Sequence, residues 1–133
     1  MTAWLAIGPP NNWEIALEKG IWGFAAMHGP LWKKMVDGEL LFFHATRPVR
    51  GVIGYGKILS RAIQKEPFWP GEATEFEWPL QVKFEVVLSI PKDQWANKAI
   101  HLGKHIGFQR ALQRLDEWSC ENIIENLQKL VEA

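Results

Sequence analysis

The sequence contains only one cysteine among its 133 residues, Cys120. A single thiol cannot form an internal disulfide bond, and this cysteine usage is typical of a reducing cytoplasm. Long hydrophobic runs are also missing, since no apolar stretch approaches the ~18 residues of a membrane-spanning helix. The first residues, MTAW, lack the basic segment and apolar segment of a secretory signal. We therefore expect a cytoplasmic protein with no membrane partner.

Motifs for common catalytic and cofactor chemistry are absent as well. The chain has no Walker loop, no GxGxxG after a strand and no CxxC pair. His101 and His105 have the spacing of metal ligands on one helical face, but Gly103 and Gly107 argue against a regular helix there, and no third ligand is evident. His44 has no carboxylate beside it in the sequence. We expect no catalytic residue, no metal and no cofactor.

Tryptophan, by contrast, is abundant. Eight residues are Trp, although the hydrophobic share of 47% and the charged share of 23% are ordinary for a globular protein. The length fits one domain, residues 1–133, with one core. A buried Trp needs a partner for its indole N–H, so a core rarely calls for this many. For any one Trp the core is the more frequent place, and one or two remain candidates to line a site.

The net charge of zero conceals a separation of charge along the chain. Residues 40–65 hold five Lys and Arg and no acid, and residues 94–115 hold four more, again without an acid. The acids gather in residues 66–77 and from Asp116 onward. If the two basic stretches share a face, that face attracts phosphate. The alternative is that each charge is simply solvated.

The hydrophobic pattern predicts an α+β fold with a small curved β-barrel and flanking helices. Strand-like patterns cover residues 4–7, 40–43, 51–59 and 80–88, and apolar and polar residues alternate in the last of these. A helix with Asn11 or Asn12 as its cap is expected to end at Gly20. A short helix begins at Pro30, and an amphipathic helix follows Ser119 as its cap.

Between the last two of these strands, residues 66–79 form a long loop that carries several large aromatic side chains. Loops of this kind are often functional lids, or they fold back onto the core.

The order and spacing of several short segments resemble the EVE domain of the PUA-like superfamily, and are similar to the YTH domain, which reads methylated adenine in RNA. The segments are residues 4–7, Asn12-Trp13-Glu14, Ile21-Trp22-Gly23, residues 36–43, residues 51–56 and residues 82–91. They span nearly the whole chain. The resemblance implies a PUA-like (EVE/YTH-like) fold and a nucleic-acid-binding module that performs no catalysis.

In both relatives the residue that matches Trp22 forms one wall of an aromatic cage around a flipped base. The long loop supplies a second wall, here Trp69, with Phe68 and Trp78 as alternatives. The expected ligand is a modified base of DNA or RNA, a methylated base first of all, because burying a methyl group gains roughly 0.8 kcal/mol. The resemblance thus implies a base-binding cage of Trp22, Gly23, Phe24, Trp69 and Trp78.

The resemblance also implies contacts with the nucleic-acid backbone after the last long strand, where the second basic stretch lies. The residues expected to contact phosphate or backbone are Lys33, Lys104, Gln109, Arg110 and Arg114. His28 and Lys33 are further candidates for the rim of the pocket. Phe24, Ala25 and Ala26 are apolar where related sequences often have a polar or basic residue.

Two other functions remain open. An RNA-processing enzyme of PUA-like fold would need His44, Lys57 and Lys104 to converge at the mouth of the pocket. A protein-interaction module would instead present Phe68 and Trp69 as an exposed patch. The sequence does not distinguish DNA from RNA and gives no oligomeric state.

Overall fold

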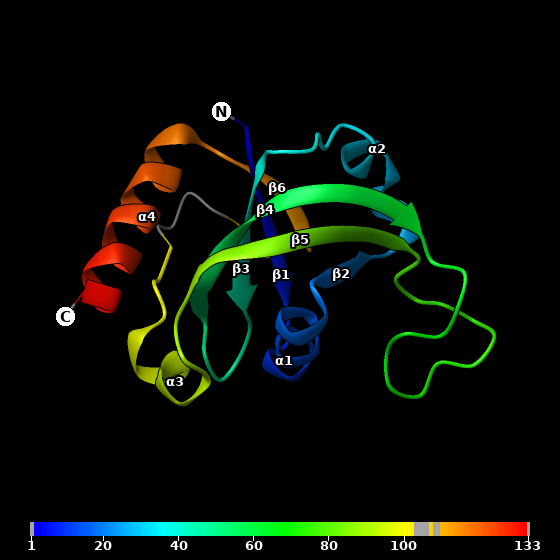
Figure 1. Ribbon diagram of the computed structural model, residues 1–133, viewed down its shortest axis with the longest axis horizontal. Coiled ribbons are helices and arrows are strands. Elements are labelled where there is room, and N and C mark those ends of the chain that lie inside the picture. Colours follow the sequence, from blue (N-terminus) through cyan, green and yellow to red (C-terminus); the bar gives the residue numbers. More distant parts are fainter. Residues whose placement is uncertain (1, 103–106, 108–109, 133) are drawn as a thin grey trace.

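The computed structural model describes residues 2–102, 107 and 110–132, which are built around one curved sheet (Figure 1). Its strands are β1 (Ala3–Gly8), β2 (Ile21–Phe24), β3 (Leu40–Ala45), β4 (Gly51–Ile63), β5 (Leu80–Ser89) and β6 (Leu112–Leu115). They lie in the order β2-β5-β4-β3-β1-β6. The pairing of β1 with β3 is parallel, and the other pairs are antiparallel. The predicted α+β architecture with a curved sheet is confirmed.

Bulges and glycines curve the two longest strands. The register between β4 and β5 shifts twice, between Tyr55 and Gly56 and between Ile58 and Ser60, and each bulge bends the strand. A Cβ atom on Gly56 would lie 2.3 Å from the carbonyl oxygen of Glu85, so only glycine permits this close approach. The bulges also break the predicted alternation along β5, and Val86 is 41% exposed although the pattern places it in the core.

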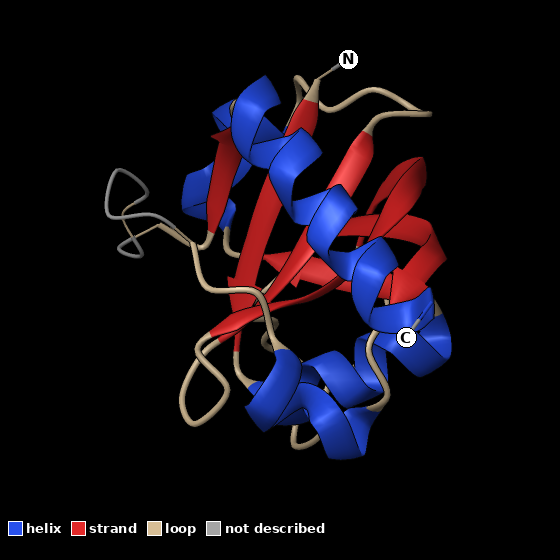
Figure 2. Cartoon of the chain, turned by 90° about the vertical axis from the view of Figure 1, so that its left-hand side faces the viewer, coloured by secondary structure: helices blue, strands red, loops and turns tan. Residues whose placement is uncertain are grey.

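The helices pack on this sheet at its ends and over one face. They are α1 (Pro10–Lys19), α2 (Gly29–Trp32), α3 (Trp95–Lys98) and α4 (Glu117–Glu132), with the 3-10 turns η1 (Ala26–His28) and η2 (Lys92–Gln94). Helix α4 lies across the strands (Figure 2). None of the helices in the described residues is long and apolar enough to cross a bilayer.

The helix ends differ in part from the predicted caps. Pro9 is the N-cap of α1, so neither Asn11 nor Asn12 caps this helix and that prediction is wrong. Gly20 ends α1 as predicted, in the left-handed conformation with φ of 71°. Asp116 rather than Ser119 caps α4, because its carboxylate accepts hydrogen bonds from the backbone N–H of Ser119 at 2.9 Å and from its hydroxyl at 2.7 Å.

The loop of residues 64–79, between β4 and β5, extends from one side of the molecule (Figure 1) and folds back so that Trp69 is buried. One carboxylate oxygen of Glu72 accepts hydrogen bonds from the side chain of Gln64 at 2.8 Å and from the backbone N–H groups of Phe68 at 3.0 Å and Trp69 at 2.8 Å. Burial raises the pKa of Glu72, but these hydrogen bonds outweigh that effect and lower the pKa overall. Glu72 therefore holds the first half of the loop together.

Candidate functional site

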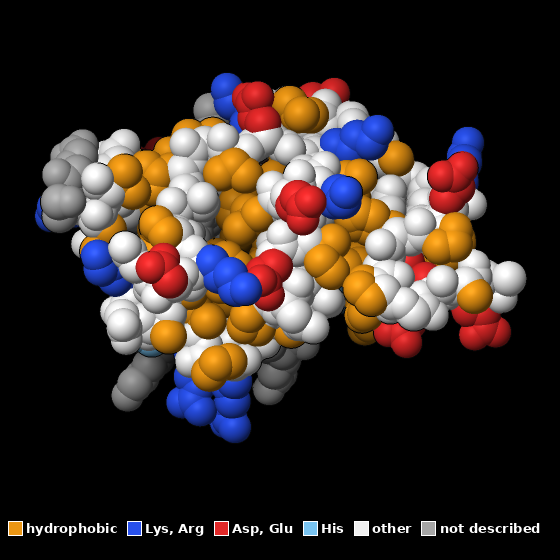
Figure 3. All heavy atoms as spheres, turned by 60° about the horizontal axis from the view of Figure 1, so that its bottom comes forward, with side chains coloured by type: hydrophobic (Ala, Val, Ile, Leu, Met, Phe, Trp, Pro, Cys, Tyr) orange, Lys and Arg blue, Asp and Glu red, His pale blue; other side chains and the backbone are white. Residues whose placement is uncertain are grey.

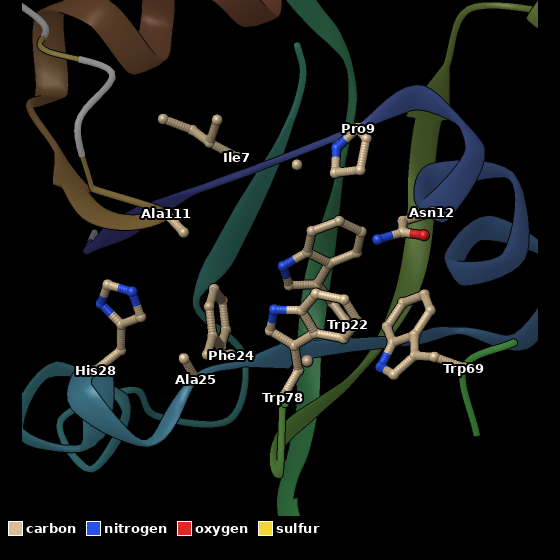
Figure 4. A pocket seen from close by; sticks show the side chains of 12 residues that line it. Ile7, Pro9, Asn12, Trp22, Phe24, Ala25, His28, Trp69, Trp78 and Ala111 are labelled. Atoms are coloured by element: carbon tan, nitrogen blue, oxygen red, sulfur yellow. The ribbon is translucent and has the colours of Figure 1, made fainter. Parts of the chain in front are cut away.

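An aromatic pocket lies where the end of β1, the start of α1, β2 and the loop of residues 64–79 meet (Figure 4). Its volume is about 80 Å³. The loop contributes Trp69 and Trp78, and β2 contributes Trp22, Gly23 and Phe24. The pocket is therefore formed by segments that lie far apart in the sequence.

Two neighbours fix the position of Trp22. Its ring stacks on Trp13 with a centroid separation of 3.7 Å and an interplanar angle of 9°. Trp13 is itself held in place, because its indole N–H donates to the carbonyl oxygen of His44 at 2.8 Å. On another side, Gly8 leaves room for Trp22, since a Cβ atom there would lie 2.3 Å from the six-membered ring.

The loop aromatics fill much of the space in front of Trp22. Trp69 meets Trp22 edge to face, at a centroid separation of 5.7 Å and an angle of 81°, and Trp78 packs on Trp69 in the same way. Trp22 and Trp69 are each only 4% exposed. A base held between two parallel rings needs them about 7 Å apart, twice the usual contact distance. The expected open cage with facing rings is therefore not formed, and the pocket is closed.

In the described part of the chain, the rim of the pocket carries the titratable side chain of His28, and the cation Arg110 lies nearby. His28 lines the pocket beside Phe24, and their ring centroids are 6.3 Å apart. Burial lowers the pKa of His28, and the charge of Arg110 lowers it further. Arg110, Met27 and Leu31 line a second hollow of about 270 Å³, which shares His28 with the first pocket. The cation thus lies next to the aromatic pocket.

The structure brings together some of the residues predicted for the site and leaves others apart. Trp22, Gly23, Phe24, Trp69 and Trp78 all line the one pocket, and Arg110 lies beside it.

The remaining predicted contacts lie elsewhere. Lys33 is exposed at the end of α2 and does not line this pocket. Arg114 lies on β6, and its guanidinium lies over the ring of Trp4, 5.2 Å from the ring centroid. Lys104 and Gln109 lie outside the described residues.

Sequence reasoning missed the contribution of the junction between β1 and α1. Gly8, Pro9 and Asn12 line the pocket from this side, and Ala111 closes it near β6. The signal for Gly8 was present, because a glycine that ends a buried strand often marks a close approach. Nothing in the spacing indicated that the partner in this approach is Trp22.

The residues considered for catalysis do not converge. His44 is buried on β3, where burial first and nearby His101 second lower its pKa to about 4. Lys57 is exposed on β4, and it pairs with Leu40 whereas His44 pairs with Val52. Lys57 and the partner of His44 on β4 are therefore five residues apart along this strand, a distance of roughly 16 Å. Among the described residues, no group of three His, Cys, Asp or Glu side chains could hold a metal ion.

The exposed patch of Phe68 and Trp69 expected for a protein-interaction module is also not formed by these two side chains. Trp69 is buried, and Phe68 is half-buried against its ring, with their centroids 4.7 Å apart.

Neither protein-family models nor curated protein sequences give a match to the chain. Solved structures, however, are similar over nearly its whole length. The YTH domain of Mmi1 in complex with RNA has a TM-score of 0.68 at 12% identity, covering 98% of this chain and 80% of that one. A Rhodopseudomonas palustris protein has a TM-score of 0.65 at 13% identity, covering 98% and 95%. A Pseudomonas putida protein has a TM-score of 0.62 at 16% identity, covering 93% and 98%. At such identities the likeness establishes the fold.

Proposed function

Because the chain has a YTH/EVE-like fold, we propose that it is a nucleic-acid-binding module that takes one base into the pocket of Trp22, without catalysis. The Mmi1 YTH domain, which has this fold, was solved in complex with RNA. The fold alone does not define a ligand. The proposal therefore depends on the pocket.

The observation that carries the proposal is the gathering of three Trp side chains around one pocket with a cation beside it. Trp22, Trp69 and Trp78 line this pocket, and Arg110 borders the adjoining hollow. A base removed from its stack recovers about 1–3 kcal/mol on an aromatic face, and a neighbouring guanidinium attracts the phosphate of the same nucleotide. These are the two contacts that a single flipped nucleotide needs.

The pocket must widen before a base can enter. Its volume of about 80 Å³ is well below the roughly 300 Å³ at which pockets for drug-sized ligands begin. The hydrogen bonds of Glu72 join residues 64–72, the first half of the loop, so this half can move outward as a unit. It then acts as a lid that carries Trp69 away from Trp22.

A modified base is the expected occupant, and a methylated base is the first candidate. Phe24 and Ala25 supply apolar surface beside the Trp rings. A methyl group buried there gains roughly 0.8 kcal/mol, which is a factor of about four in affinity. The same reasoning applies to DNA and to RNA.

Titration with short oligonucleotides that carry one modified or one unmodified base tests the proposal, with tryptophan fluorescence as the signal. The variant Trp22→Ala is expected to lose at least tenfold in affinity, because the stacking face is removed. Trp118→Ala is the matched control, because Trp118 is 67% exposed on α4. If every base binds equally poorly and Trp22→Ala binds as the unaltered protein does, the pocket is not a base site.

A further inference from the structure

The hydrogen bonding of the buried tryptophans separates two of them from the rest. Four indole N–H groups donate to defined acceptors: Trp4 to Glu39, Trp13 to His44, Trp32 to Gln81 and Trp95 to Ile90, at 2.7–3.1 Å. Within the described residues, the buried indole N–H groups of Trp22 and Trp69 have no acceptor. Both of these side chains line the aromatic pocket.

A buried donor without an acceptor is costly, because the group has lost its bonds to water and gained nothing in return. Native proteins contain few such groups, and each one calls for an explanation. Trp22 and Trp69 come from separate segments, yet their unpaired N–H groups meet at one pocket. A ligand that accepts hydrogen bonds from them explains both at once.

The indole nitrogens border the pocket from two sides. The indole nitrogens of Trp22 and Trp78 point to the same side of the pocket, where Phe24, His28 and Ala111 lie (Figure 4). The nitrogen of Trp69 is on the opposite flank, 3.1 Å from the position that a Cβ atom on Gly23 would take, and the carbonyl oxygen of Trp78 lies 2.8 Å from the same position. Glycine at this position thus lets the backbone of β2 approach Trp69 and Trp78 closely.

The pocket offers few acceptors to balance these donors. Among the described residues, no carboxylate lines it, and its other polar side chains are those of Asn12 and His28. Burial and the charge of Arg110 lower the pKa of His28 and so favour its uncharged ring, and none of the other lining residues that the structure describes carries a charge. The preferred partner of such a lining is an uncharged acceptor, and among bases that is a carbonyl oxygen.

We propose that the pocket selects a base whose inserted edge carries hydrogen-bond acceptors, above all a carbonyl oxygen, for the N–H groups of Trp22 and Trp69, which border the pocket on two sides. This inference depends on the proposed function and concerns only which bases the pocket takes. A base that presents an amino group at the same place leaves the indole donors unpaired and adds another donor without an acceptor. Sites that bind through polar groups reject such analogues strongly.

Two pairs of single-stranded oligonucleotides test the inference, each pair differing at one central base. Hypoxanthine and adenine share a purine ring, with a carbonyl oxygen in the first where the second has an amino group. Thymine and 5-methylcytosine share the methyl group and the C2 carbonyl oxygen, and differ in the same way at C4. The member with the carbonyl oxygen at C6 or C4, called the carbonyl member, is expected to bind about tenfold more tightly, in titrations followed by fluorescence.

The variants Trp22→Phe and Trp69→Phe keep an aromatic ring and remove the N–H group. Each is expected to reduce the preference for the carbonyl member by about fivefold, which corresponds to one hydrogen bond. Trp32→Phe is the matched control, because the Trp32 N–H donates to the carbonyl oxygen of Gln81 at 3.1 Å outside the pocket. The Trp32→Phe variant is expected to prefer the carbonyl member as strongly as the unaltered protein does.

A measurement on the unaltered protein guards against variants that fail to fold. In ¹⁵N spectra, the indole resonances of Trp22 and Trp69 are expected to move downfield with the hypoxanthine oligonucleotide and to shift less with the adenine one. If oligonucleotides bind at Trp22 without this preference, or both Phe variants retain it, the inference is wrong and the proposed function stands. If Trp22→Ala leaves all binding unchanged, the proposed function fails, and the inference fails with it.

Discussion

Trp13 supports the site without lining it. Its ring lies 3.7 Å from that of Trp22, and its N–H group is bonded to the backbone of β3. One face of Trp22 therefore stacks on a rigid platform, and the side chain also lines the pocket. Rigid aromatic platforms favour binding because little side-chain freedom is lost when a ligand arrives.

The contact between Gly8 and Trp22 gives a prediction at the scale of one residue. Gly8→Ala places a methyl group 2.3 Å from the Trp22 ring, so the ring must shift and the pocket loses its shape. We expect a loss of about 1–3 kcal/mol in the free energy of unfolding, as for other overpacked sites. Urea denaturation, together with oligonucleotide titration, measures both effects.

Gly29→Ala is the control for this substitution, because a Cβ atom on Gly29 would make only an ordinary contact of 3.9 Å. It is expected to leave the stability the same or slightly higher. Equal stability of Gly8→Ala and the unaltered protein would show that the Trp22 ring has room to spare.

His44 gives a second prediction at this scale, concerning the dependence of stability on pH. Burial and nearby His101 lower its pKa from 6.5 to about 4. Between these two pH values the unfolded chain binds a proton that the folded protein excludes, so the free energy of unfolding falls as the pH falls. The loss is at most about 3 kcal/mol and is complete near pH 4.

Denaturation at pH 7.5 and pH 5 measures this effect, and His44→Gln is the comparison because glutamine does not titrate. His28, whose pKa is also lowered, contributes a change of the same sign in both proteins. The free energy of unfolding of His44→Gln is therefore expected to depend on pH more weakly than that of the unaltered protein. An unchanged dependence would mean that His44 takes up its proton freely in the folded protein.

At the scale of elements, the loop of residues 64–79 depends on one carboxylate. Glu72→Gln removes the charged acceptor of three hydrogen bonds and is expected to loosen the loop while the sheet stays intact. Trp69 would become more exposed, which shifts its fluorescence to longer wavelength, and proteases would cut the loop faster. Because the pKa of Glu72 is lowered, acid should produce the same loosening only below the usual range of a carboxyl group.

Glu75→Gln is the matched control, because Glu75 lies exposed in the same loop. Its rate of proteolysis is expected to equal that of the unaltered protein. If proteases cut the loop at the same rate in Glu72→Gln and Glu75→Gln, the packing of Trp69 alone keeps the loop closed.

The elements also show what a single sequence can and cannot predict. The longer strands and α4 were predicted because each repeats its pattern several times. Strands β2 and β6 contain only four residues each, which is too short for a period to be recognised. The parallel pairing of β1 with β3 joins residues far apart in the chain, and no local pattern encodes it.

The site was predictable to a different degree. Resemblance placed Trp22 and Trp69 in one pocket, but not the edge-to-face contact that closes it. Arg114 shows a second limit, because the sequence gives its charge but not that its guanidinium lies over Trp4. Charge in a sequence does not specify which surface a long side chain covers.

For the molecule as a whole, the distribution of charge suggests a direction of approach. Acidic side chains gather at the right-hand end in Figure 3, where Figure 1 shows the loop of residues 64–79. Such an end repels phosphate, whereas Arg110 lies on the other side of the pocket, next to His28. We therefore expect the backbone of a bound strand to run past Arg110.

This arrangement predicts how binding depends on salt. Arg110→Gln should weaken binding to all oligonucleotides alike and reduce the slope of log affinity against log salt by about 1. Arg114→Gln is the matched control, because its guanidinium lies over Trp4 away from the pocket, and its slope should stay unchanged. Affinity that does not vary with salt would indicate a protein partner instead of nucleic acid.

The close stacking of Trp13 and Trp22 has an optical consequence. Two indole rings in nearly parallel contact couple their electronic transitions, and such coupling produces a paired positive and negative band in the circular dichroism spectrum. Any ligand that rotates or displaces Trp22 would alter that pair of bands, while the tryptophans outside the pocket contribute a constant background. The protein therefore carries its own spectroscopic probe of whether the pocket is occupied, and no label is needed to read it.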